Sequence, residues 1–197
     1  MLRVGVYGGA FSPIHNGHIA AAKAFMEKMW LDVLFGVPTG KSPHKEMDTT
    51  ASDKDRIEMC RRAFEGVEGV IISDVEIRRG DTSYSIETLS SFNDEDRRLF
   101  MLCGTDMMLT LGEWHDADEI FRLSYPVYIR REEDRELDAK IIETNTRYFE
   151  TLDKYNQSEK DLQLLNDDIN KFKTEKEKET ENLRQELAFY TNGKGIK

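Results

Sequence analysis

The sequence predicts an α/β fold, a Rossmann-like, doubly wound parallel sheet of about five strands, followed by an extended helical C-terminal tail. Up to about residue 131, short apolar runs alternate with stretches of helical periodicity, as in consecutive βαβ units. From about residue 132 to residue 190 the chain holds no glycine or proline and is dense in Lys, Glu, Asp and Asn, which indicates helix. We expect a Rossmann-like domain over residues 1–147 and a charged helical tail over residues 148–197.

Nine elements are expected in the first of these two regions. The apolar runs predict strands at residues 3–7, 32–37, 70–77, 99–103 and 126–130. The periodic stretches between them predict helices at residues 18–29, 52–65, 84–92 and 106–123. Ligands of such sheets bind beyond the carboxyl ends of the strands. The loops that follow the strands are therefore where a functional site is expected.

The loop after the first strand carries the strongest functional signal. It has the sequence Gly8-Gly9-Ala10-Phe11-Ser12-Pro13-Ile14-His15-Asn16-Gly17-His18 and leads into a helix. Glycines let backbone N–H groups approach a phosphate, and a helix N-terminus adds partial positive charge. His15 and His18 can donate hydrogen bonds to the same anion. As metal ligands they lack a nearby third His or Cys. The loop therefore predicts a site for nucleotide phosphates.

Two further loops are candidate substrate contacts. His44 and Lys45 lie in a basic loop after the second strand, which predicts either a second grip on phosphate or a merely solvated loop. Hydroxyl residues surround the start of the helix at residues 84–92, where they can cap it. The free N–H groups of that first turn could also receive a carboxylate. The residues concerned are Thr82, Ser83, Tyr84 and Thr88.

The remaining candidates follow the fourth and fifth strands. Asp106, two residues after Gly104, is placed where an acidic residue commonly binds ribose hydroxyls, although it could also cap the next helix. Trp114 offers a flat face to a heteroaromatic ring, or it fills the core. Arg131, beside Arg130, indicates either a clamp on phosphate charge or a surface pair bonded to the following glutamates.

Composition restricts the class of protein. The 197 residues carry a net charge of −10, which argues against sequence-independent nucleic-acid binding. No apolar run reaches membrane-spanning length and no signal peptide is recognised, so no membrane partner is expected. Cys60 and Cys103 are too few for a disulfide framework and are expected to be buried thiols. These features predict a cytoplasmic protein.

The tail has a heptad-like pattern that is not sustained. Apolar residues recur at heptad spacing between Tyr155 and Phe172, and the seam breaks at Lys176 and Glu179. Because fewer than three clean heptads remain, the pattern favours a solvated helix over a weak coiled coil. A homo-oligomer held by this seam stays open as an alternative.

Taken together, these segments resemble the nicotinate-nucleotide adenylyltransferases, within the nucleotidyltransferase superfamily that carries His-x-Gly-His. The matching pieces occur in family order across residues 1–147: residues 8–18, 43–45, 73–76 and 83–88, Gly104-Thr105-Asp106 with Trp114, and residues 127–131. The resemblance implies adenylyl transfer from ATP to nicotinate mononucleotide with Mg²⁺. The products would be deamido-NAD and pyrophosphate, in a step of NAD biosynthesis.

The resemblance also implies a role for each site residue. His15 and His18 would be the catalytic residues, in contact with the ATP phosphates. The other ATP-binding positions would be Gly8, Gly9, Ala10, Phe11, Gly104 and Asp106, with Asp106 on the ribose. The nicotinate mononucleotide would contact His44, Lys45, Thr82, Ser83, Tyr84, Thr88, Trp114 and Arg131. Of these, Trp114 would stack on the pyridine ring, and backbone groups at residues 82–84 would receive its carboxylate. No protein ligand to a metal is implied.

One part of the family pattern is not found. The second signature, Ile-Ser-Ser-Thr-x-Ile-Arg, lies near the C-terminus of family members, where this chain has its charged tail. That difference leaves two alternatives to the implied reaction. One is an adenylyltransferase that acts on nicotinamide mononucleotide. The other is a catalytically impaired nucleotide-binding protein whose tail binds a partner.

Overall fold

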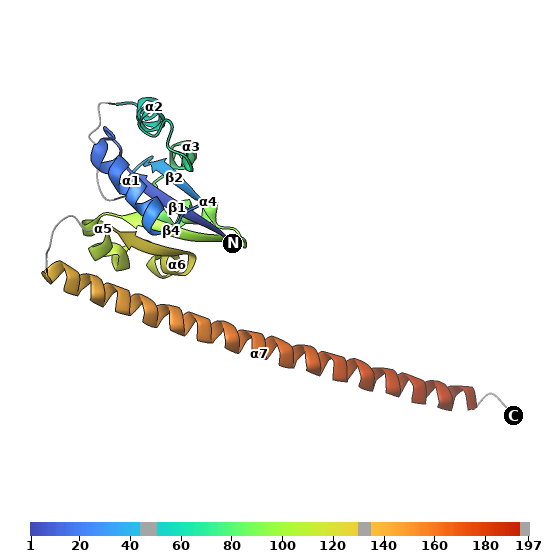
Figure 1. Cartoon of the computed structure of the whole chain (residues 1–197). Coiled ribbons are helices and arrows are strands. Elements are labelled where there is room, and N and C mark those ends of the chain that lie inside the picture. The colour runs from blue at the N-terminus through green and yellow to red at the C-terminus, as the bar shows by residue number, and fades with distance from the viewer. Residues whose placement is uncertain (44–50, 130–134, 194–197) are drawn as a thin grey trace. The chain divides into compact units, whose positions relative to one another are not determined.

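The computed structural model describes residues 1–43, 51–129 and 135–193. It contains one parallel five-stranded sheet in the order β3-β2-β1-β4-β5 (Figure 1). The strands are β1 (Leu2–Gly9), β2 (Val33–Pro38), β3 (Val70–Ile72), β4 (Arg97–Cys103) and β5 (Ser124–Tyr128). Because the first strand is central and the order reverses beside it, this is the doubly wound Rossmann-like sheet that the sequence predicts.

Helices cover both faces of the sheet (Figure 1). They are α1 (Asn16–Lys28), α2 (Asp53–Ala63), α3 (Val75–Arg79), α4 (Ser85–Phe92), α5 (Thr105–Thr110) and α6 (Ala117–Leu123), with a 3₁₀ turn η1 at Leu111–Glu113. One face packs under α1 and the end of α2 in a cluster of Ala22, Phe25, Leu34, Phe64, Phe100 and Leu102. On the other face, Phe92 of α4 stacks on Phe35 of β2, with ring centroids 4.3 Å apart.

Two elements differ from the sequence prediction. The strand expected at residues 70–77 ends at Ile72 and gives way to α3. The hydroxyl of Ser73 accepts a hydrogen bond from the N–H of Val75, a local turn that competes with the ladder. The helix expected at residues 106–123 is divided into α5, η1 and α6. Trp114 is extended there and Asp116 has a φ of 51°, so the backbone cannot continue as one helix.

The helical structure expected from about residue 132 to residue 190 is one helix, α7 (Arg135–Gly193). The chain divides into two compact units, Met1–Phe149 and Glu150–Lys197. In the first unit, Ile141 of α7 is buried. In the second, the side chains of residues 153–182 are exposed, including those of the heptad-like seam. No helix in the described part of the chain is long and apolar enough to cross a membrane.

Candidate functional site

The loops that the sequence marks as functional follow β1 and β2, which are neighbours in the sheet. Gly9, at the end of β1, pairs with Pro38, at the end of β2. One residue further on, the N–H of Thr39 donates to the carbonyl of Gly9 at 2.9 Å. The first loop (residues 8–15) and the second loop (residues 39–43) therefore leave the same edge of the sheet side by side. This edge is also the switch point of the strand order, where ligands of such folds bind.

His15 and His18 form a reciprocal cap at the start of α1. The Nδ1 atom of His15 accepts from the backbone N–H of Gly17 at 3.1 Å, and Nδ1 of His18 accepts from the N–H of His15 at 3.3 Å. The two ring centroids are 3.8 Å apart. Because each Nδ1 is an acceptor, the neutral rings carry their protons on Nε2. The donor of each neutral imidazole is thus Nε2–H rather than Nδ1–H.

Phe11 packs its buried ring against this histidine pair. Its side chain is 2% exposed, and its ring meets the ring of His18 edge-on at 5.2 Å and that of Tyr7 at 5.3 Å. The backbone of Phe11 has a φ of 44°, in the left-handed region that bulky residues seldom adopt. Burial of the ring offsets this backbone strain, and the bent loop that results places the α1 N-terminus beside the end of β1.

The charge at this helix start favours an anion. α1 has 13 residues and no acidic side chain in its first turn, so its partial positive end is not neutralised locally. The histidine pair therefore stands at a helix end that carries partial positive charge and no acidic side chain. Such an arrangement suits phosphate oxygens, even in a chain whose net charge is −10.

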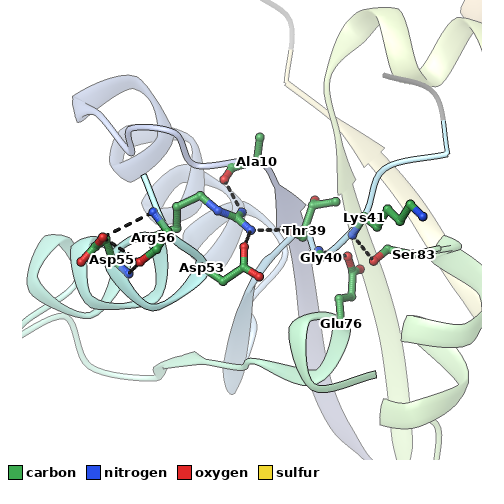
Figure 2. A network of polar contacts seen from close by, with 10 residues as sticks. Ala10, Thr39, Gly40, Lys41, Asp53, Asp55, Arg56, Glu76 and Ser83 are labelled. Atoms are coloured by element: carbon green, nitrogen blue, oxygen red, sulfur yellow. Dashed lines mark hydrogen bonds and ion pairs between the residues drawn. The ribbon is translucent and has the colours of Figure 1, made fainter. Parts of the chain in front are cut away.

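A buried arginine joins the first two loops (Figure 2). Arg56, on α2, has a fully buried side chain. Its Nη1 donates to the carbonyl of Ala10, and its Nη2 donates to the carbonyl of Thr39, each at 2.8 Å. Nη2 also pairs with the carboxylate of Asp53 at 2.6 Å. One guanidinium group therefore bonds the backbones of both loops.

The second loop is in turn bonded to the segment before α4 (Figure 2). The N–H of Gly40 donates to Glu76 at 3.3 Å, and the N–H of Lys41 donates to the hydroxyl of Ser83 at 3.2 Å. The N–H of Ser83 donates to the carbonyl of Lys41 at 2.7 Å. Thr88 is buried and donates to the carboxylate of Glu76 at 2.7 Å. Ser83 and Thr88, both predicted substrate contacts, thus have partners within the protein.

The start of α4 follows this bonded segment. Its N-cap residue is Tyr84, and no side chain caps it, so the hydroxyl capping considered from the sequence does not occur. The backbone N–H of Ser83 is already used by Lys41. A carboxylate at this end of α4 would therefore be received by the N–H groups that follow Ser83. Thr82 forms a bridge to Lys41 and is half-buried.

Asp106 and Trp114 lie beyond β4. Gly104, not Asp106, is the N-cap of α5, so Asp106 stands in the first turn with an exposed side chain. The capping alternative considered for Asp106 is therefore wrong. Trp114 is half-buried rather than a core residue, and its indole N–H donates to the hydroxyl of Thr110 at 3.2 Å. The neighbouring His115 ring lies 4.5 Å from the ring of Tyr84. Aromatic groups therefore meet between the start of α4 and the end of η1.

Three predicted contacts lie outside the described residues: His44, Lys45 and Arg131. Among the residues that are described, no group of three or more His, Cys, Asp or Glu side chains could hold a metal ion.

Sequence reasoning missed Arg56 and Glu76. A signal for Arg56 was present, because Arg56 and Cys60 of α2 and its C-cap residue Phe64 recur at a spacing of four and are all buried. A charged residue in such an apolar stripe needs buried polar partners. Glu76 belongs to the family-matching residues 73–76, but it stood inside a segment predicted to be a strand and no role was assigned to it.

Comparison with known proteins identifies the family. A model of the cytidylyltransferase-like family matches residues 6–184, and the chain belongs to that family. It is 38% identical over 130 residues to a protein of Desulfatibacillum aliphaticivorans named probable nicotinate-nucleotide adenylyltransferase, covering 66% of this chain and 60% of that protein. A protein of the same name from Opitutus terrae is 36% identical over 132 residues, which cover 66% of this chain and 68% of the relative. The resemblance read from the motifs is thereby confirmed.

Solved structures confirm the fold. The nicotinic acid mononucleotide adenylyltransferase of Plasmodium falciparum, in complex with NaAD, has a TM-score of 0.60 at 15% identity, over 71% of each chain. The same enzyme in complex with APC gives a TM-score of 0.57 at 14% identity. The chain spans 60% of the length of the first two curated relatives that it matches.

Proposed function

We propose that the protein transfers the adenylyl group of ATP to nicotinate mononucleotide, with deamido-NAD and pyrophosphate as products. The observation that carries the proposal is the pair of histidines that cap the N-terminus of α1. This helix end has no acidic side chain in its first turn and lies at the edge of the sheet where the strand order reverses. The relatives' names point to the same reaction.

The proposed reaction needs no covalent enzyme intermediate. A phosphate oxygen of the mononucleotide attacks the α-phosphorus of ATP, and the bond from that phosphorus to the bridging oxygen of the β-phosphate breaks. Negative charge grows on the departing pyrophosphate. The protein's part is to align the two substrates and to stabilise this charge with fixed donors. The Nε2–H groups of His15 and His18 are such donors.

The remaining predicted contacts fit this division of the site. We propose that backbone groups of Gly8, Gly9 and Ala10 line the phosphates of ATP, that Phe11 supports them, and that Asp106 after Gly104 binds the ribose. A second set receives the pyridine nucleotide, with Trp114 and Tyr84 beside the ring and the N–H groups at the start of α4 on its carboxylate. Ser83 and Thr88 act by holding the second loop rather than by touching substrate. His44, Lys45 and Arg131 stay predictions for the mononucleotide.

Nucleotidyltransferases of this family generally use a divalent metal. We propose Mg²⁺, delivered as the ATP complex. Mg²⁺ keeps several waters and is commonly held by substrate phosphates with few protein carboxylates.

The test is release of pyrophosphate by the full chain with ATP and Mg²⁺. Nicotinate mononucleotide, nicotinamide mononucleotide and phosphopantetheine serve as parallel acceptors. We expect turnover with the acid substrate, and weaker turnover with the amide because it lacks the carboxylate charge that the α4 N-terminus attracts. Equal rates with acid and amide would contradict the specificity. A folded protein that binds ATP and turns over no acceptor would overturn the reaction and favour the nucleotide-binding alternative.

The buried thiols support a reducing, cytoplasmic location, which we also propose. Cys60 and Cys103 are free and buried. Burial raises the pKa of Cys60 to about 11 and that of Cys103 to about 12, so neither is a reactive thiolate near neutral pH.

We further propose that the full chain self-associates through the second unit. Leu162, Leu165, Ile169 and Phe172 lie at the spacing of a two-stranded seam, and each is more than a third exposed. In a parallel pair, Asp168 of one copy would face Lys173 of the other, and Lys154 would face Glu159. Because the seam is short, the association is expected to be weak.

Replacing a seam residue should abolish this association. We expect light scattering of the concentrated full chain to show a mass above that of the monomer, and Leu165→Lys to restore the monomer. The matched control is Leu164→Lys, because Leu164 is 64% exposed but lies off the seam. A monomeric wild type, or equal masses for the two variants, would contradict the proposal.

A further inference from the structure

We propose that Arg56 is a positioning residue that fixes the separation of the first and second loops. It thereby sets the width of the space between these loops that receives the ATP phosphates, which we call the cradle. This inference rests on the proposed function, since it assigns the two loops to ATP. It concerns a residue on α2 that lies behind the loops, where its guanidinium group is fully buried.

The partners of Arg56 lie at the positions that define the cradle. Ala10 follows the glycine pair, and Thr39 follows the end of β2, so they are 46 and 17 residues from Arg56 in the chain. Both acceptors are backbone carbonyls. The guanidinium therefore fixes the course of two backbones rather than the conformation of side chains, and each amino group holds one loop (Figure 2).

The chemistry of arginine suits this task better than that of any other side chain. Its planar fork presents several donors at fixed angles, whereas a lysine ammonium is a point charge on a flexible stem. Burial of a charge is costly, and an apolar side chain of similar volume would commonly stabilise a core at least as well. Here the counterion, Asp53, has a side chain that is 57% exposed, and the Nε of Arg56 has no partner among the described residues. The burial of Arg56 is thus explained by the two loops that its guanidinium group connects rather than by a gain in stability.

The effect of Arg56 extends to the histidine pair and to the second substrate's side. Ala10 directly precedes Phe11 in the chain, and the ring of Phe11 contacts the ring of His18. Thr39 directly precedes Gly40, whose N–H donates a hydrogen bond to Glu76. A shift of the guanidinium would therefore move the backbone of the first loop directly. It would reach the start of α4, which we assign to the pyridine nucleotide, only through the second loop. ATP binding should be more sensitive to Arg56 than binding of the pyridine nucleotide.

The test compares Arg56→Lys with wild type in the full chain. We expect the Kd and KM for ATP to rise roughly tenfold or more, because misplacement by about 1 Å can cost up to 10²-fold. The KM for nicotinate mononucleotide should change much less. Hydrogen exchange should become faster in peptides covering residues 8–12 and 39–41 and stay unchanged in β4. The matched control is Arg61→Lys, an exposed arginine on the same helix, which should behave as wild type.

Two results would overturn the proposal. One is an ATP Kd within about twofold of wild type in a folded Arg56→Lys protein, since a tenfold change corresponds to only 1.4 kcal/mol and would be readily measured. The other is exchange that rises equally in β4 and in the loops, because a merely structural role would loosen the whole sheet.

Asp53→Ala carries the test if Arg56→Lys does not fold. It leaves the donors to Ala10 and Thr39 in place but removes the carboxylate that orients the Nη2 amino group on Thr39, so exchange should become faster at residues 39–41 and not at residues 8–12. Faster exchange in both loops, or in neither, would then overturn the proposal. A wild-type chain that binds ATP without releasing pyrophosphate would overturn only the proposed reaction, because calorimetry and exchange still decide the role of Arg56.

Discussion

Replacement of His18 by asparagine is expected to lower kcat by about 10²–10³-fold while leaving the fold intact, as removal of a single transition-state donor does in other enzymes. The asparagine Oδ1 can take the place of Nδ1 and accept the N–H of His15, so the cap of α1 is kept. What is lost is the Nε2–H that we assign to the phosphates. Pyrophosphate release under saturating substrates measures the effect, and thermal unfolding checks the fold.

His18→Gln is the complementary variant. Its side-chain amide reaches the position of Nε2 and can donate there, but it no longer accepts the N–H of His15. We expect this variant to be less stable than His18→Asn and to retain more activity. If the asparagine variant were the more active of the two, His18 would matter for capping rather than for catalysis.

The parts of the fold predicted from sequence are those that depend on local pattern. β1, β2, β4 and β5 are short apolar runs with helical periodicity between them, and the structure moves their bounds by only a few residues. The third strand was predicted too long, because 70–77 is apolar enough for a strand, whereas a local hydroxyl bond at Ser73 and the burial of Glu76 end it early. Such competition is decided by tertiary partners that the sequence does not display.

The candidate site divides in the same way. The glycine-rich loop and its histidines were found because all of their functional groups lie in one short segment, residues 8–18. Arg56 and Glu76 hold the two loops through hydrogen bonds that span 17 to 46 residues, so no local motif marks them. Thr88 was assigned to substrate from its position in a motif, but its hydroxyl donates to buried Glu76. Hydroxyl residues near a helix start can serve a ligand or the protein itself, and only the three-dimensional structure distinguishes the two.

Alanine substitutions at two glycines should separate space kept for a ligand from space filled by protein. A Cβ at Gly40 would lie 2.7 Å from the backbone carbonyl oxygen of Glu76, which cannot move aside without displacing α3. We expect Gly40→Ala to lower the free energy of unfolding by about 1–3 kcal/mol, the usual cost of overpacking. Urea unfolding of the full chain measures this change.

Gly8 presents the opposite case. A Cβ there would meet no atom within 4 Å, and the φ of Gly8 is not in the left-handed region. Gly8→Ala should therefore leave the free energy of unfolding within about 0.5 kcal/mol of wild type. If ATP phosphates approach this backbone closely, the added methyl group collides with them, and the KM for ATP should rise roughly tenfold or more. An unchanged KM would place the phosphates elsewhere and leave Gly8 without a role in binding, whereas a loss of stability matching that of Gly40→Ala would mean that the space above Gly8 belongs to the protein's own packing.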